Sequence, residues 1–101
     1  MIKATVLYSH PTDEKAFEKY YAEKHHPFVL KVKGIVKWEY TKFLPGPDGA
    51  APAYYRMAEL YFTTPEEMQV AMASPEGQAM AGDLTNFATG GVTILMGTFK
   101  N

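Results

Sequence analysis

His25 has the strongest case for a chemical role in this chain. It follows Phe17 and Tyr21 at intervals of four residues, so the three side chains lie along one stripe of a predicted helix. An aromatic stripe is expected to face a sheet, which places the imidazole at the edge of a helix–sheet cleft. A histidine titrates near neutral pH and can act there as general acid or base. The alternative is a core histidine that only bonds to a neighbour.

Two polar residues of the last predicted helix could support His25. Asp83 and Asn86 are three residues apart and share a helix face. A carboxylate that reaches His25 would orient the imidazole, as a third group orients a catalytic base. The alternative for Asp83 is a bond to its local backbone. Asn86 is a candidate ligand contact, and its alternative is a role in ending the helix.

No cofactor or metal site is expected. The chain has no cysteine, which excludes disulfides, thiolate catalysis and cysteine-bound metals. His26 is rotated about 100° from His25 around the helix, so the two cannot chelate one ion in the usual way. His10, in the first turn, is expected to be exposed. No glycine-rich phosphate loop is present.

Aromatic side chains could line a pocket for a flat, apolar ligand. Only some of them can share a face, and aromatic stripes often form plain core or interface. The candidates for substrate contact, besides Asn86, are Tyr8, Tyr21, Phe28, Trp38 and Tyr55.

The first half of the chain predicts two strands around one helix. Residues 2–8 alternate in polarity, and residues 35–44 do so again. Asp13 can cap a helix between them. Pro27 should perturb that helix near its end, and Gly34 closes the following segment.

The second half predicts two further strands and a helical region. Residues 45–52 form a long turn, and residues 54–62 form a strand that pairs antiparallel with the preceding one. Thr64 and Ser74 each precede a proline and are predicted helix caps, with the second helix continuing to Phe87. Gly90-Gly91 is predicted to end this helix, and residues 92–99 are predicted to form the last strand.

This order predicts one α+β domain over residues 1–101, a ferredoxin-like βαββαβ plait. It has a four-stranded antiparallel sheet with helices on one face. The second face is expected to be apolar, with tryptophan or tyrosine, methionine and isoleucine, and to be covered by a two-fold partner. Glu59 would find its partner across that dimer axis, in Lys37 or Arg56.

Charge and hydropathy exclude other classes. The net charge is −1 without a basic stripe, so we expect no nucleic-acid partner. No segment approaches the ~20 apolar residues of a membrane span, and no leader pattern is present. We expect a protein of the cytoplasm that does not bind membranes.

The chain resembles the EthD family, named for bacterial ethyl tert-butyl ether degradation. The pattern Tyr21-x-x-x-His25-x-Pro27 followed by Gly34 carries the resemblance. The supporting stretches are Tyr61-Phe62, Ala73 to Gln78, and Asp83-Leu84-x-Asn86-Phe87.

The resemblance implies a dimeric α/β barrel with His25 as the working residue. Phe28 stands where the family commonly has leucine, which keeps an apolar anchor. The leading hypothesis is a cofactor-independent enzyme that moves protons on an apolar aromatic or cyclic small molecule. The alternatives are a non-catalytic dimeric binding protein and a cofactor-independent monooxygenase of the same superfamily.

Overall fold

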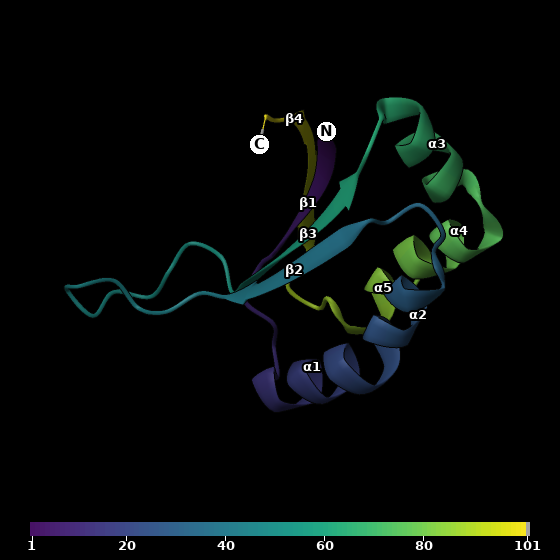
Figure 1. Ribbon diagram of the computed structural model, residues 1–101. Coiled ribbons are helices and arrows are strands. Elements are labelled where there is room, and N and C mark those ends of the chain that lie inside the picture. The colour runs from purple at the N-terminus through teal and green to yellow at the C-terminus, as the bar shows by residue number, and fades with distance from the viewer. Residues whose placement is uncertain (101) are drawn as a thin grey trace.

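The computed structural model describes residues 1–100, which contain one four-stranded sheet (Figure 1). Every strand pairing is antiparallel, and the strands lie in the order β2-β3-β1-β4. This order confirms the ferredoxin-like α+β fold. The loop of residues 43–55 projects away from the body of the molecule (Figure 1). The strands are β1 (Ile2–Tyr8), β2 (Lys37–Lys42), β3 (Arg56–Phe62) and β4 (Val92–Thr98).

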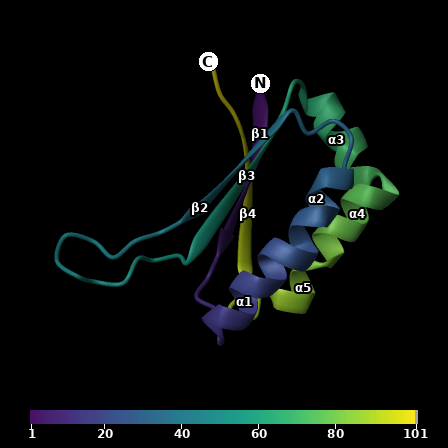
Figure 2. The same ribbon diagram turned by 60° about the horizontal axis from the view of Figure 1, so that its bottom comes forward.

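All the helices of the described chain lie on one side of the sheet (Figure 2). None of them, within residues 1–100, combines the length and apolarity needed to cross a bilayer. The first helical segment comprises α1 (Glu14–Tyr20), the π-helical turn η1 (Tyr21–His25) and α2 (His26–Lys31). The second comprises α3 (Pro65–Ala73), α4 (Pro75–Gly82) and α5 (Leu84–Phe87).

The hydrogen-bond pattern of the first helical segment changes just before Pro27. Asp13 caps α1 as predicted, accepting the Ala16 N–H at 3.1 Å. Proline has no N–H to donate, and in an α-helix its ring crowds the carbonyl four residues earlier. The turn before Pro27 is widened, because the His26 N–H bonds to the Tyr21 carbonyl five residues back. Pro27 therefore perturbs the helix, as expected, by a π-turn that leaves the helix running on to Lys31.

The second helical segment has both predicted caps and one break that was not predicted. Thr64 accepts the Glu67 N–H, and Ser74 accepts the Gly77 N–H. The prediction of one helix from Ser74 to Phe87 is wrong, because α4 ends at Gly82 and α5 begins at Leu84. The Asn86 N–H bonds to the Asp83 carbonyl only three residues back, which tightens the turn and places Asp83 at the break.

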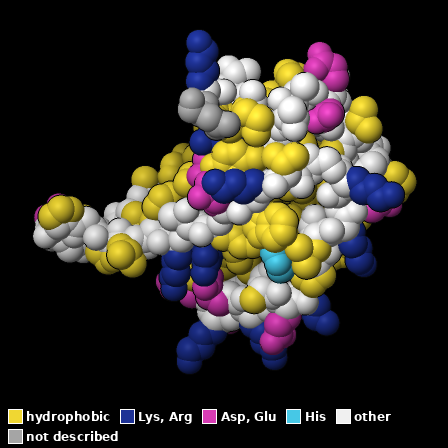
Figure 3. Space-filling model, viewed as in Figure 1, with side chains coloured by type: hydrophobic (Ala, Val, Ile, Leu, Met, Phe, Trp, Pro, Cys, Tyr) yellow, Lys and Arg dark blue, Asp and Glu magenta, His cyan; other side chains and the backbone are white. Residues whose placement is uncertain are grey.

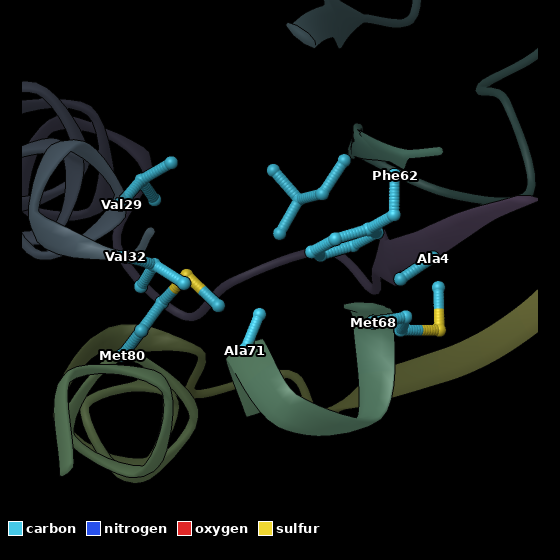
Figure 4. Packing of buried hydrophobic residues seen from close by; sticks show 8 residues of the cluster. Ala4, Val29, Val32, Phe62, Met68, Ala71 and Met80 are labelled. Atoms are coloured by element: carbon cyan, nitrogen blue, oxygen red, sulfur yellow. The ribbon is translucent and has the colours of Figure 1, made fainter. Parts of the chain in front are cut away.

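Two buried clusters fill the space between sheet and helices. In the first, Val29 of α2, Val32 directly after it and Met80 of α4 converge on the sheet residues Ala4 and Phe62 (Figure 4). The second is mostly aromatic and lies nearer the start of the first helical segment. Its buried members are Val6, Tyr8, Phe17, Tyr21, Tyr55, Ala58 and Phe87.

The far face of the sheet is less apolar than expected. Strand register places Trp38 opposite the buried Leu60 and places Ile94 opposite Val6, so the tryptophan and isoleucine belong to the helix side. The correction follows from residue alternation, because Trp38 and Ile94 share the phase of the residues that α2–α4 cover.

Charged pairs occupy part of that far face. Lys3 Nζ lies 2.6 Å from Glu59 Oε2, so Glu59 has a partner in its own chain rather than across a dimer axis. Neighbouring β1 supplies this lysine because Thr5 is opposite Glu59 and Lys3 is one pleat away on the same face. The Tyr61 hydroxyl donates to Glu39.

Replacement of Gly77 by alanine is predicted to destabilise the fold. A Cβ at Gly77 would lie 2.1 Å from the Ala71 carbonyl oxygen, a backbone atom that cannot move aside cheaply. We expect a loss of about 1–3 kcal/mol in unfolding free energy, measured by urea denaturation. The matched control is Gly82→Ala at the end of the same helix, where a Cβ meets nothing within 4 Å. The control should be neutral or stabilising by up to about 1 kcal/mol, and equal losses in both variants would contradict the packing argument.

Candidate active site

The structure brings His25 and Asp83 together in the interior. His25 ends η1 and Asp83 lies between α4 and α5, and each is 4% exposed. The distance from His25 Nδ1 to Asp83 Oδ2 is 2.9 Å. The contact proposed from the sequence is thus present. Since a carboxylate only accepts, Nδ1 carries the proton and Nε2 is left free to accept one.

The Asp83 carboxylate is held by two further donors. The Tyr20 hydroxyl donates to Oδ1 at 2.6 Å, and Asn86 Nδ2 donates to the same oxygen at 2.9 Å. Burial opposes ionisation of Asp83, but the bonds from Tyr20, Asn86 and His25 outweigh it, and its pKa falls below the usual value. The carboxylate is therefore charged at neutral pH and fixed in orientation.

His25 is neutral at physiological pH. Burial lowers its pKa below the ordinary 6.5, although the bond to Asp83 and the charge of that residue act in the opposite direction. The net shift is downward, because a ring this deeply buried loses most of its hydration when charged. A neutral ring with a protonated Nδ1 presents Nε2 as a base.

His25 lines an apolar cavity between the sheet and the helices. The cavity has a volume of about 50 Å³, room for a few water molecules. Tyr8, Tyr21 and Tyr40 supply its aromatic walls, and no Lys, Arg, Asp or Glu among the described residues lines it. The other lining residues are Ala4, Val6, Val29, Ala58, Leu60, Met72, Met80, Ala81, Leu84, Ile94 and Met96.

Aromatic packing fixes the plane of the imidazole. The rings of Tyr21 and His25 stack with centroids 6.0 Å apart and planes 11° apart. Phe87 packs on the histidine at a centroid distance of 4.7 Å. Because η1 is a π-turn, residues four apart in it are more nearly aligned than in an α-helix. The π-turn and the stack together orient His25.

Only two of the predicted substrate contacts reach this cavity. Tyr8 and Tyr21 line it, whereas Trp38, 40% exposed, lies in an open groove beside it. Figure 3 shows hydrophobic surface and a histidine on the face between sheet and helices. Tyr55 donates instead to Glu18.

Phe28 and Asn86 also lie outside the cavity lining. Phe28 packs half-buried against the cluster of Figure 4. Asn86 is exposed and holds Asp83 rather than a cavity surface. Its position on the outer side of Asp83 explains why it cannot reach the cavity.

Two functional-site residues were missed from the sequence. Tyr20 anchors Asp83, and Tyr40 forms a wall shared by the cavity and the open groove. The Tyr40 hydroxyl lies 2.8 Å from Nδ1 of His26, so His26 is half-buried rather than free. The alternation of residues along this strand predicted that Tyr40 shares a face with Trp38, but it did not predict how deeply Tyr40 is buried. His10 is exposed, as expected.

Metal ligation finds no support in the described residues. Within residues 1–100, no three histidine, aspartate or glutamate side chains gather as a metal site would require.

Known proteins share both the sequence and the fold. Residues 9–91 match the EthD domain. An uncharacterized 11.0 kDa protein of the thcB–thcC intergenic region in Rhodococcus erythropolis is 42% identical over 95 residues, covering 94% of this chain and 91% of the relative.

Two solved structures have folds similar to this one. An EthD family protein from Bacillus halodurans superposes with a TM-score of 0.92 at 32% identity, covering 99% of both chains. SnoaB, a cofactor-independent oxygenase from Streptomyces nogalater, has a TM-score of 0.62 at 18% identity, covering 99% of this chain and 90% of its own. That second likeness concerns the fold alone. With the domain match spanning most of its length, the chain belongs to the EthD family.

Proposed function

We propose that this protein is a cofactor-independent enzyme that moves protons on a small apolar aromatic or cyclic molecule, with His25 as the acid/base. The observation that carries the proposal is the buried His25–Asp83 pair in the wall of an apolar cavity. A histidine oriented by a carboxylate and shielded from water is an arrangement suited to general-base catalysis.

The cavity lining supports an uncharged, compact substrate. A charged group would lose its hydration there without gaining an opposite charge from the lining. The volume of about 50 Å³ is far below the roughly 300–1,000 Å³ of drug-sized pockets. We therefore propose a ligand no larger than about one ring, held between aromatic walls.

A second candidate is oxygenation without a cofactor. The fold likeness to SnoaB, itself a cofactor-independent oxygenase, favours it. The same base would deprotonate an electron-rich substrate, and molecular oxygen would then be the co-reactant. Oxygen consumption in the assay below separates this candidate from simple proton transfer, because proton transfer consumes none.

We further propose that the protein is a homodimer built on the far face of the sheet. Leu7, Met57 and the 55% exposed Leu95 form an apolar strip there. The Lys3–Glu59 pair beside it carries both signs of charge, so a two-fold copy would meet complementary groups.

Loss of the His25 imidazole is predicted to abolish proton transfer but not binding. Small cyclic ketones and phenols in D₂O, followed by proton NMR, report enzyme-promoted exchange of C–H hydrogens. We expect His25→Ala to slow exchange by about 10²–10⁴-fold while ligand chemical-shift changes persist. His10→Gln, an exposed site, is the matched control. If only affinity changes in His25→Ala, the protein is a binding protein.

The pH dependence should follow a histidine pKa below 6.5. Because the neutral ring is the base, the exchange rate should rise with pH through that pKa and level off above it. Asp83→Asn removes an influence that raises the pKa, so the pKa should fall further and the level rate should drop. Imidazole NMR titration measures both proteins. A His25 pKa above 6.5 would contradict the neutral-base assignment.

A charge on the far face should break the proposed dimer. Light scattering after gel filtration should give twice the 11.3 kDa chain mass for the unmodified protein. Leu95→Glu should give the monomer mass, because the glutamate would be buried unpaired. Val70→Glu, at a 72% exposed position of α3, should stay dimeric. A monomeric unmodified protein would refute the dimer.

A further inference from the structure

The Tyr21 hydroxyl is the unexplained polar group of the cavity. Tyr21 is 6% exposed, and its hydroxyl is the one buried side-chain nitrogen or oxygen among the described residues that has no hydrogen-bond partner. An unsatisfied buried polar group costs about 1–3 kcal/mol. A phenylalanine would pack in the same aromatic cluster without that cost.

The neighbouring carboxylates are already engaged elsewhere. Glu18 receives the Tyr55 hydroxyl at 3.0 Å and the Arg56 Nε at 2.8 Å. Asp83 is engaged by His25 and by Tyr20. The Arg56 guanidinium lies over the Tyr21 ring, 5.2 Å from its centroid, and so contacts the aromatic face. The Tyr8 hydroxyl acts on Tyr21 as a donor toward its oxygen, an influence that lowers the Tyr21 pKa. The Tyr21 O–H therefore has no acceptor among the described residues and is available to something that enters the cavity.

The Tyr21 hydroxyl keeps its proton and can donate it in a hydrogen bond. Burial raises its pKa far above the ordinary 10, with a further increase from Tyr40, while Arg56 and the Tyr8 hydroxyl lower it by less. The hydroxyl therefore stays protonated. Tyr21 lines the same cavity as His25, and the two rings stack. One wall thus offers a donor from Tyr21 beside an acceptor from His25 Nε2.

We propose that Tyr21 binds the oxygen of an uncharged carbonyl group, so that the substrate class is a small cyclic or aromatic ketone. His25 Nε2 takes a proton from the carbon next to the carbonyl. The C–H electron pair forms a C=C bond, and the carbonyl π pair moves to the oxygen, where the Tyr21 O–H stabilises it. Return of the proton from His25 completes the transfer. This inference rests on the proposed function.

The test replaces Tyr21 by phenylalanine and follows both exchange and the carbonyl group. With a ¹³C=O-labelled cyclic ketone such as cyclohexanone, the infrared carbonyl band should shift to lower frequency on binding the unmodified protein. Tyr21→Phe should lose that shift and slow α-hydrogen exchange by about 10²–10³-fold, the usual effect of removing one oxyanion donor. His25→Ala should keep the shift and lose the exchange.

A matched variant tests whether the Tyr21 hydroxyl only stabilises the fold instead of binding a ligand. Tyr55→Phe removes a hydroxyl that has a partner, Glu18, outside the cavity lining, so it should lower stability and leave exchange nearly unchanged. Tyr21→Phe should not lower stability. A loss of stability equal to that of Tyr55→Phe would overturn the proposal.

Other outcomes separate this inference from the proposed function. Unchanged exchange and an unchanged band in Tyr21→Phe, with exchange lost in His25→Ala, would overturn the role of Tyr21 alone. A band shift lost in Tyr21→Phe, with exchange insensitive to His25, would overturn proton transfer while upholding carbonyl binding. No band shift with any ketone of the panel would overturn the substrate class.

Discussion

The buried carboxylate of Asp83 is the interaction on which the rest of the site depends. A lone charge at this depth would cost several kcal/mol in lost hydration. Donors from Tyr20, His25 and Asn86 offset that cost and also tie the first helical segment to the second. The bond from His25 also decides which nitrogen of the histidine carries the proton. Helix packing and the protonation state of the base are therefore set by a single group.

The remaining constraint is the proline that follows the histidine pair. Pro27 is accommodated by a widened turn before it, and that turn contains both Tyr21 and His25. Their rings then stack over the sheet residues that floor the cavity. A backbone irregularity, which would weaken an ordinary helix, here aligns a hydroxyl donor with an imidazole acceptor. π-turns occur frequently at functional sites for this kind of reason.

Local signals predicted the fold well. The strand at residues 2–8 and the caps Asp13, Thr64 and Ser74 are confirmed, because alternation and capping are properties of short segments. The His25–Asp83 contact was also foreseen. Both Tyr8 and Tyr55 are buried. Periodicity could not show which part of the interior a side chain reaches, and so it did not separate Tyr8, which lines the cavity, from Tyr55, which does not.

Long-range pairings were the part that sequence patterns could not supply. The residue that pairs with Glu59 depends on strand register. It is Lys3 of the same chain rather than a basic residue of a partner chain. Tyr20 lies outside the four-residue spacing of Phe17, Tyr21 and His25, and no local pattern shows that it reaches Asp83 on another helical segment. The break at Asp83 was not predicted, although Gly82 directly before it is a residue type that often ends helices.

The π-turn also makes the number of residues before Pro27 a condition for the site. A π-turn holds one residue more than an α-turn, so a chain shorter by one residue here would wind as an α-helix. Its aromatic stripe would then be rotated by about 100° relative to α2. Proteins with this fold that lack one residue between the tyrosine and the proline should therefore keep the scaffold but lose the pairing of hydroxyl donor and imidazole base.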